Sequence, residues 1–494
     1  MRRRGRPTLV IWVPALVSFV VSFVEVLHRG VASPYDTGVY LDAAYQSAIG
    51  WTPYRDFAFV QPSGVLYWLT PAALVAHHVS AAAGLLVARL TAALAAAGSV
   101  GLLAYILRRR RSAAWCAAMT LAVAPSAIAA AAQVKIEPFL LVAVMAGVAA
   151  LDPDGKETSD RRVRWAAIFF GLALATKLWA AFPIVAWLVV SPPRRGARMS
   201  SLTWLALGTF WALPPVALLD PRAIWHDVVA AQATRHGGPR IPSWRRLDTL
   251  VDLPHLSPSL GVALAVILGL GWAAMSVTLW RRGGRLNRLV ALNAAFGAVI
   301  ALVPVEFYSY YAYYVDAWLI VGLSLVVTPL LATSTLRRVT GGVLVASLAA
   351  VTFVSYPSQT SDVYAYETAI IRHYVSPTEC VFYSIPLVGL EAGRIDRPSL
   401  LCPLVVDPFG VSMALNANEA THHWESTFAR YDVLVLGPLR TSLVPLTPAL
   451  RQWLRVHFVE VYFSPGTLYI LKNRTDAPAP TVSASRIARQ VNIK

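Results

Sequence analysis

The 494 residues are 56% hydrophobic and only 14% charged. A soluble domain carries about 25% charged residues, so this chain has too few to keep a folded surface in water. The charged residues lie mostly in short clusters between apolar runs, and runs of about 20 apolar residues are long enough to cross a bilayer. The composition therefore excludes an ordinary soluble protein and predicts an integral membrane protein.

The net charge of +17 comes mostly from arginines between the apolar runs. Basic residues in such positions mark the cytoplasmic side of a membrane protein. No nucleic-acid motif and no surface of interleaved basic and aromatic residues accompanies them. We therefore expect membrane lipids, and no nucleic acid, to surround this protein.

About eleven apolar segments are predicted to span the membrane as helices. In chain order they cover residues 9–27, 83–107, 112–131, 134–151, 165–178, 179–191, 201–219, 258–280, 287–304, 311–332 and 339–356. With the N-terminus inside, every basic cluster between them falls on the cytoplasmic side. The predicted fold class is a polytopic α-helical protein of the plasma (inner) membrane, with residues 1–357 as its transmembrane region and its C-terminal part outside.

Two long loops, 28–82 and 220–257, face the external side in this topology. The apolar stretch 62–79 could also span, but counting it would invert every later basic cluster. Its proline start, Trp68 and His77–His78 suit a helix that lies in the membrane interface. Because the cytoplasmic loops are brief, we expect the functional site to lie outside.

The region 358–472 is predicted to form a small external α/β domain. Short β-branched runs at 379–385 and 431–436 are typical of strands, and the runs 458–463 and 468–471 flank a hairpin turn signal. Residues 473–494 are polar and rich in Ala and Pro, which predicts disorder. An oxidising compartment would permit a disulfide between Cys380 and Cys402; the spacing is equally compatible with two free thiols.

The first external loop holds the richest group of polar residues. Asp36 follows the first predicted helix closely, which places it at the outer membrane surface, where a carboxylate can take a proton from an attacking hydroxyl. On a helix Tyr40 would share the face of Asp36, whereas Asp42 would be turned away. An isolated loop carboxylate is most often an ordinary surface residue, so the surrounding pattern decides its interpretation.

That pattern consists of an Asp just after the first helix, then Tyr and Ala at helical spacing, then Gly-x-x-Pro-Tyr-x-Asp-Phe at 50–57 and Pro-Ser-Gly at 62–64. It resembles the GT-C glycosyltransferases, and most of all the bacterial relatives of protein O-mannosyltransferases and of lipid A aminoarabinose transferases. The resemblance covers the topology of 9–356, and its specific motifs lie in 36–64. It implies transfer of a sugar from a polyprenyl-phosphate donor to an envelope glycan, lipid or protein acceptor at the external membrane face.

The resemblance also assigns roles to individual residues. Asp36 corresponds to the catalytic base, and Glu137, in the turn between the third and fourth helices, takes a second acidic catalytic position. An interfacial charge pair of Lys135 with Glu137 is the alternative. Lys177 falls where the family binds the lipid phosphate, although a lysine that snorkels to the headgroups would look the same. Direct displacement at the anomeric carbon of a hexosyl or pentosyl donor would invert its configuration.

The remaining predicted substrate-binding residues are less specific. Arg235 and Arg240, in the second external loop, could grip phosphate by bidentate hydrogen bonds or contact anionic headgroups. Tyr310 and Tyr311 would line the sugar pocket, although aromatic belts are common at membrane interfaces and the His often found there in the family is missing. The predicted set is completed by Tyr40, Asp42, Asp56 and Lys135.

Metal dependence and two other functions remain open at this stage. Asp36 and Glu137 could share a divalent cation, since some GT-C enzymes need one and others do not. A transporter or lipid flippase would want charged residues within the bundle and broken helices at its midplane, whereas the unusual charges here cluster at the external face. A non-catalytic scaffold would not require Asp36 and Glu137 to converge.

Overall fold

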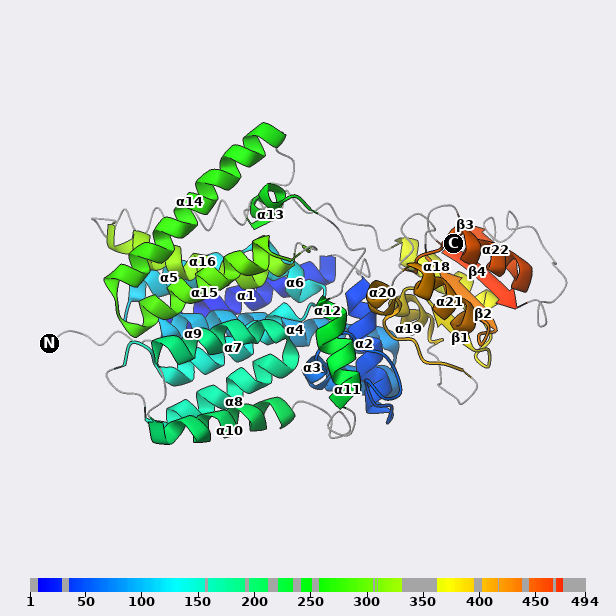
Figure 1. The fold of residues 1–494 in the computed structure, drawn as a ribbon, viewed down its shortest axis with the longest axis horizontal. Helices are drawn as coiled ribbons and strands as arrows, with labels where there is room; N and C mark the ends of the chain where they lie inside the picture. Colours follow the sequence, from blue (N-terminus) through cyan, green and yellow to red (C-terminus); the bar gives the residue numbers. More distant parts are fainter. Residues whose placement is uncertain are drawn as a thin grey trace.

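The computed structural model describes residues 8–28, 35–155, 159–191, 195–211, 221–233, 241–250, 257–304, 307–308, 310–330, 362–394, 402–415, 417–437, 444–464 and 468–473. A long body of helices forms one end of the molecule, and a smaller domain that contains the β-strands lies at the opposite end (Figure 1). The short helices α2 and α11 run across the end of the helical body where the two parts meet (Figure 1).

The helical body follows the apolar segments of the sequence. Its helices are α1 (Thr8–His28), α4 (Ala81–Ile106), α5 (Arg111–Ala122), α6 (Pro125–Ala132), α7 (Glu137–Leu151), α8 (Asp160–Thr176), η1 (Leu178–Ala180), α9 (Ala181–Val190), α10 (Arg195–Trp211), α14 (Pro258–Arg282), α15 (Arg285–Leu302), α16 (Tyr311–Val327) and η4 (Thr328–Leu330). Each of the first ten predicted spans overlaps one of these helices or a consecutive pair. The predicted span 339–356 lies outside the described residues.

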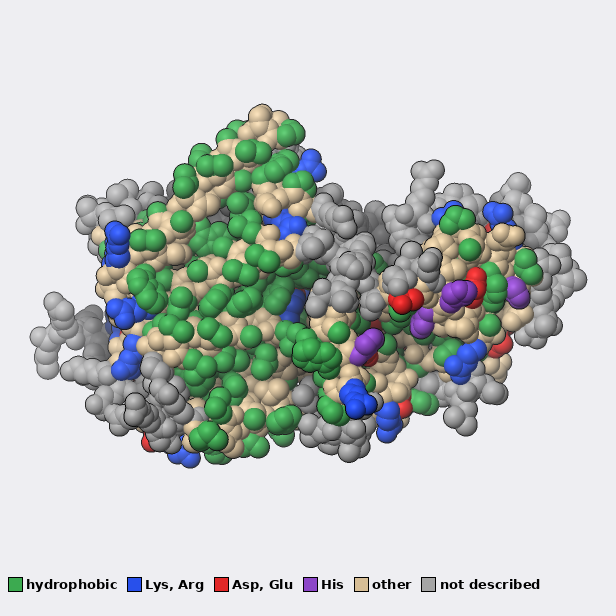
Figure 2. Space-filling view, viewed as in Figure 1, with side chains coloured by type: hydrophobic (Ala, Val, Ile, Leu, Met, Phe, Trp, Pro, Cys, Tyr) green, Lys and Arg blue, Asp and Glu red, His purple; other side chains and the backbone are tan. Residues whose placement is uncertain are grey.

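Four helices in the described part of the chain are long and apolar enough to cross a bilayer alone, namely α1, α4, α14 and α15. The predicted span 112–131 is instead two helices, α5 and α6, bent by 50° at their junction. The bend lies at Pro125, the first residue of α6, because proline has no N–H to donate within a helix. Large apolar side chains stay exposed along α1 and α14, and the visible face of the body is predominantly hydrophobic (Figure 2). Such a surface is suited to lipid.

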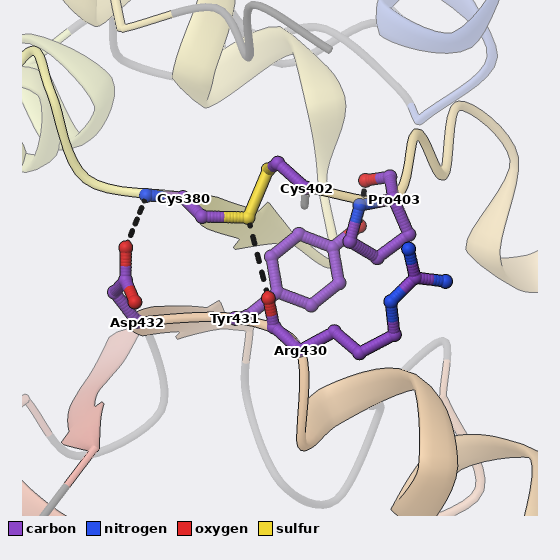
Figure 3. The surroundings of a disulfide bond; sticks show 6 residues. All are labelled: Cys380, Cys402, Pro403, Arg430, Tyr431 and Asp432. Carbon is purple, nitrogen blue, oxygen red and sulfur yellow. Dashed lines mark hydrogen bonds between the residues drawn. A yellow bond between two sulfur atoms is a disulfide. The ribbon is translucent and has the colours of Figure 1, made fainter. Parts of the chain in front are cut away.

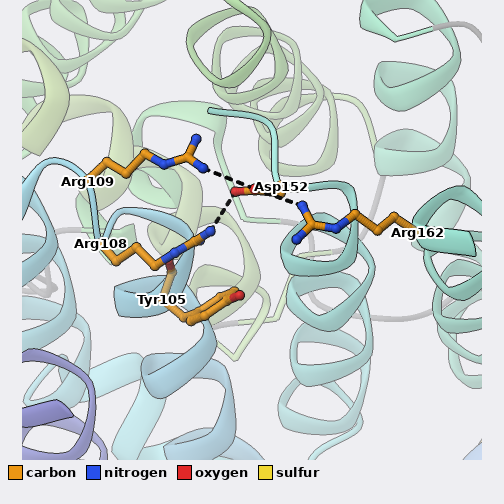
Figure 4. Close-up of polar contacts among 5 residues, drawn as sticks. All are labelled: Tyr105, Arg108, Arg109, Asp152 and Arg162. Carbon is orange, nitrogen blue, oxygen red and sulfur yellow. Dashed lines mark hydrogen bonds and ion pairs between the residues drawn. The ribbon is translucent and has the colours of Figure 1, made fainter. Parts of the chain in front are cut away.

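Basic residues gather at the end of the body remote from the smaller domain (Figure 2). Asp152, directly after α7, accepts hydrogen bonds from Arg108 at 2.7 Å, from Arg162 at 2.8 Å and from Arg109 at 3.2 Å (Figure 4). Arg108 and Arg109 follow α4, and Arg162 lies in the first turn of α8. Arginines from two of the basic clusters used to predict topology, 108–111 and 156–164, therefore meet at one carboxylate, as residues on one membrane face would.

The connecting helices are α2 (Tyr35–Ala48), α3 (Gly64–His78), α11 (Pro221–Ile224), the π-helix η3 (Trp225–Ala230), α12 (Ala231–Ala233) and α13 (Ser243–Leu250). Helices α2, α3, α11 and α12 lie near the smaller domain (Figure 1), whereas α13 packs against α14 and α15. The stretch 62–79, predicted as an interfacial helix, contains α3. A hydrophobic core joins α2, α3 and α4 to Leu387, Leu390 and Val406 of the smaller domain.

The smaller domain is built on a four-stranded sheet with strand order β1-β2-β4-β3. Its elements are α18 (Asp362–Tyr374), β1 (Val381–Tyr383), α19 (Pro386–Ala392), α20 (Pro408–Ala414), α21 (Ala417–Phe428), β2 (Val433–Leu436), α22 (Pro448–His457), β3 (Phe458–Ser464) and β4 (Leu468–Asn473). Strands β1 and β2 are parallel, and β3 and β4 pair as an antiparallel hairpin. Each predicted strand overlaps one of these four. The predicted run 379–385 extends two residues beyond β1 at each end.

Both faces of this sheet are covered. Leu434 and Leu436 of β2 pack into one hydrophobic cluster, while Val433 and Val435 pack into another on the opposite face. A strand buried on both faces reads as a continuous apolar run, as β2 does. A disulfide joins Cys380, just before β1, to Cys402 in the segment that leads to α20 (Figure 3). It thereby fixes this segment to the edge of the sheet.

Candidate active site

The first turn of α2 presents Asp36 at the junction of the helical body and the smaller domain. A carboxylate in the first turn is favoured there by the helix dipole. The next residue, Thr37, donates its hydroxyl to the backbone carbonyl of Gln133, 2.5 Å away. At Gly38, two residues after Asp36, a side chain would place its Cβ 2.4 Å from the backbone nitrogen of Leu387. The start of α2 is therefore wedged between the turn after α6 and the helix α19.

The turn after α6 carries Lys135 and Glu137. Val134 in this turn has φ of 49°, a left-handed conformation that is costly for a β-branched residue. The chain tolerates it because Val134 is fully buried and the turn is closed by Lys135 N, which donates to the carbonyl of Ala130 at 2.9 Å. Strain of this kind gathers at functional sites. It turns the chain so that Lys135 reaches the start of α2.

Two lysine–carboxylate pairs form the centre of the site. Lys135 Nζ lies 2.6 Å from Asp36 Oδ2, and their side chains are 3% and 23% exposed. Lys177 donates to Glu137 Oε1, and these side chains are 9% and 1% exposed. Asp36 is therefore the more accessible of the two carboxylates. The alternative interpretation of the sequence, a pair between Lys135 and Glu137, is not the arrangement seen.

Lys177 is held at the point where α8 ends and η1 begins. Its backbone is extended, with φ of −157° and ψ of 138°, and so it interrupts the helical run. Lys177 thus lies at the break between α8 and η1, close to the boundary between the predicted spans 165–178 and 179–191. Helix α3 supports the site from behind, because Cβ at Gly64 would lie 2.4 Å from the carbonyl oxygen of Ala175. Only glycine permits this approach two residues before Lys177.

Aromatic rings surround both ammonium groups. Lys135 Nζ lies 4.1 Å from the centre of the Tyr310 ring, and Lys177 Nζ lies 3.8 Å from that of Trp179 and 4.7 Å from that of Tyr311. The Trp179 and Tyr311 rings meet edge to face at 4.5 Å. Cations are attracted to aromatic faces, so the rings hold the lysines in place. Sequence reasoning did not include Trp179, although its place two residues after Lys177 was a signal.

The electrostatics connect Tyr40 and Tyr310 to the same centre. Burial raises the pKa of the Tyr40 hydroxyl, and the Asp36 and Glu137 carboxylates raise it further. Burial, Asp36, Tyr311, Tyr40 and Glu137 likewise raise the pKa of Tyr310. The structure thus brings together most of the predicted site residues, namely Asp36, Tyr40, Lys135, Glu137, Lys177, Tyr310 and Tyr311.

The other predicted residues lie elsewhere or outside the described part. Asp42 is buried against the smaller domain, beside Tyr383 and Leu404, and accepts from Gln46 at 3.1 Å. Asp56 pairs with Arg55 at 2.7 Å and accepts from the backbone N–H of Thr52, so it stabilises its own loop. Arg235 and Arg240 lie outside the described residues.

The donor set at this centre does not favour a resident metal ion. Each carboxylate already has a lysine ammonium beside it, and these ammonium groups occupy the positions from which a cation would neutralise the carboxylates. Across the described ranges of the chain, no group of three or more His, Cys, Asp or Glu is placed to hold a metal ion.

Comparison with known proteins identifies the fold of this chain. No family model matches the sequence. No curated protein matches it either. ArnT from Cupriavidus metallidurans bound to undecaprenyl phosphate superposes over 94% of this chain and 99% of its own, with a TM-score of 0.61 and 15% identity. Its apo state gives a TM-score of 0.62 at 13% identity. The chain has the GT-C fold.

Two larger GT-C proteins share the fold less closely. The mycobacterial arabinofuranosyltransferase AftD matches 95% of this chain but only 40% of its own length, with a TM-score of 0.51 at 14% identity. The Archaeoglobus fulgidus oligosaccharyltransferase matches 96% of this chain and 75% of its own, with a TM-score of 0.50 at 13% identity. The GT-C architecture suggested by the loop motifs is therefore confirmed, at identities that speak for the fold alone.

Proposed function

We propose that this GT-C protein is a membrane glycosyltransferase. It moves a sugar from a polyprenyl-phosphate donor to an envelope glycan, lipid or protein acceptor at the external face of the plasma (inner) membrane. The observation that carries the proposal is the convergence of Asp36, Lys135, Glu137 and Lys177 at one end of the helical body. The fold shared with ArnT, whose structure holds undecaprenyl phosphate, supports the donor class.

Asp36 acts as the general base in this proposal. Its side chain is 23% exposed, against 1% for Glu137, so an acceptor hydroxyl can reach it. As the hydroxyl attacks the anomeric carbon of the donor, Asp36 takes its proton. The C–O bond to the phosphate breaks on the opposite face, and the configuration at that carbon inverts. Glu137, sealed from the acceptor, serves this step by holding Lys177.

The lysines act on the leaving group. A polyprenyl-phosphate sugar is a phosphodiester with one negative charge, and the departing polyprenyl phosphate gains a second charge as the bond breaks. Preorganised cations placed where charge develops stabilise the transition state more than the ground state. Lys177 and Lys135 are such cations, and the rings of Trp179, Tyr310 and Tyr311 keep them in place.

The proposed orientation of the protein in the membrane follows from the end of the helical body opposite to the site. Lys and Arg side chains gather at the end of the helical body remote from the smaller domain (Figure 2), and basic clusters favour the cytoplasm. The N-terminus is then cytoplasmic, and the site and residues 358–472 are extracytoplasmic. The disulfide between Cys380 and Cys402 suits an oxidising compartment.

A donor panel tests the function. Membranes that contain the wild-type protein, the Asp36→Asn variant or the Asp160→Asn variant are incubated with radiolabelled hexosyl and pentosyl polyprenyl phosphates. We expect transfer by the wild type and by Asp160→Asn, whose exposed carboxylate lies at the start of α8. We expect a loss of at least about 100-fold with Asp36→Asn. Absence of transfer from every donor by folded wild-type protein would refute the proposal and favour a transporter.

A further inference from the structure

The residue before the proposed base is bound by the smaller domain. The Tyr35 hydroxyl donates to Asp407 Oδ1 at 2.7 Å, across a sequence separation of 372. The same hydroxyl accepts from the backbone N–H of Phe409 at 2.8 Å. The ring of Tyr35 also meets that of Phe409 edge to face, with centroids 6.0 Å apart. One side chain of α2 thus makes a donor, an acceptor and a ring contact with a single segment of the other domain.

Asp407 is itself rigidly placed. It is 5% exposed, and its Oδ1 also accepts from the backbone N–H of Gly410 at 2.8 Å, which caps α20. Its segment begins at Cys402, which the disulfide ties to the edge of the sheet. Asp407 is therefore held in place by its own domain, and its position determines that of the Tyr35 hydroxyl.

The other contacts of α2 leave Asp36 between two anchors. Thr37 is bound to the turn after α6 through Gln133, and Gly38 lies against Leu387. Removal of the Tyr35 contact would leave Thr37 bound to the helical body and Gly38 packed on α19, but the residue next to Asp36 would lose its hydrogen bonds to the segment 407–409. The first turn of a helix frays most readily when its anchors are lost, and Asp36 lies in that turn.

We propose that Asp407 is a positioning residue: through the Tyr35 hydroxyl, the C-terminal domain fixes the first turn of α2 and so aims the Asp36 carboxylate. The inference rests on the proposed function, in which Asp36 is the base. It assigns to the C-terminal domain a part in assembling the catalytic site, in addition to any contact with the acceptor. We call the contact between Tyr35 and Asp407 the latch.

The latch can be tested first without any substrate. Hydrogen–deuterium exchange of the peptide that contains α2 is measured in the full-length wild type, Tyr35→Phe and Asp407→Ser. Serine still offers an oxygen to cap α20 but is too short to reach Tyr35. The matched control is Tyr45→Phe, which removes an exposed hydroxyl that contacts His77 at the other end of α2. We expect faster exchange at the start of α2 in the two latch variants and wild-type exchange in the control.

Turnover then tests the consequence. A misplacement of about 1 Å in a reacting group can cost about 100-fold in rate, so we expect each latch variant to lose about 10-fold to 100-fold in kcat. The KM for the donor should stay within about twofold, because the lysines are untouched. The double variant should be no slower than the worse single one, since both changes remove one contact. If the two changes instead acted by a general loss of stability, they would lower the folded fraction, and the losses of activity in the two single variants would multiply in the double variant.

The outcomes separate the latch from the function. If the wild type transfers sugar while both latch variants retain its kcat within twofold, or if their losses multiply, the latch proposal is wrong. Wild-type exchange at the start of α2 in both latch variants would also contradict the latch proposal. If the folded wild type transfers no sugar from any donor, the proposed function fails, and the exchange experiment alone decides whether Asp407 holds α2.

Discussion

Lys177 donates a hydrogen bond to Glu137 in a place where both side chains are almost sealed from solvent, 9% and 1% exposed. Breaking one partner of a buried ion pair costs about 3–5 kcal/mol, because the remaining charge loses its compensation, whereas removal of both costs much less. The pair therefore joins the start of α7 to the end of α8 and contributes to stability as well as to the proposed chemistry.

We expect Glu137→Gln to lower the free energy of unfolding by about 3–5 kcal/mol and to abolish sugar transfer. The double variant Glu137→Gln/Lys177→Gln should regain part of this stability but no activity. Thermal unfolding in detergent, followed beside the transfer assay, measures both effects. Additive losses of stability in the double variant would show that the two side chains do not act as a pair.

Asp42 makes stability depend on pH. Its pKa is raised from 3.8 to about 7, because burial disfavours the charged form more than the hydrogen bond from Gln46 favours it. The folded protein therefore binds a proton that the unfolded chain releases between about pH 4 and pH 7, and stability falls as the pH rises through this window. The contribution is on the order of a few kcal/mol.

We expect Asp42→Asn to unfold at a higher temperature than the wild type at pH 8, and the difference to become smaller at pH 5. Asparagine keeps the oxygen that accepts from Gln46 but carries no charge to bury. Thermal melts of both proteins at the two pH values are sufficient for this comparison. Equal melting temperatures at pH 8 would mean that the Asp42 carboxylate is not desolvated at the junction with the C-terminal domain.

Gly64 permits the close contact of α3 with the end of α8. In Gly64→Ala the new Cβ would lie 2.4 Å from the Ala175 carbonyl oxygen and 2.6 Å from its carbon, both backbone atoms. Overpacking costs about 1–3 kcal/mol, and the expected shift displaces Lys177. We expect a lower melting temperature and, on the proposed function, slower sugar transfer. Gly269→Ala in α14, where nothing lies within 4 Å of the new Cβ, is the matched control and should change neither quantity.

The disulfide between Cys380 and Cys402 closes a sequence separation of 22. For such a loop the chain-entropy model gives a stabilisation of about 3 kcal/mol. We expect a reductant, or Cys380→Ser/Cys402→Ser, to lower the melting temperature. Limited proteolysis should then cut the C-terminal domain faster. The variant Cys116→Ser, which removes the free thiol, should leave the reductant response unchanged.

The sequence alone determined most of the helical architecture. In a bilayer a long apolar run satisfies its backbone hydrogen bonds by forming a helix, so each of the first ten predicted spans overlaps a helix or a consecutive pair of helices. Short β-branched runs and a turn signal likewise located the strands. The exception was the bend between α5 and α6 at Pro125. The mean hydropathy of an apolar run hardly changes with a single proline, so the predicted span did not show the break that the missing N–H causes.

The site was predictable as a set of residue types and not as a set of partners. Motifs at the ends of apolar runs located Asp36, Lys135, Glu137 and Lys177 on one side of the membrane. Which lysine binds which carboxylate depends on where α2 begins relative to the turn after α6, 99 residues away. Asp407 left no signal at all, because a contact across 372 residues is decided by how two domains pack, and packing is a property of the folded chain.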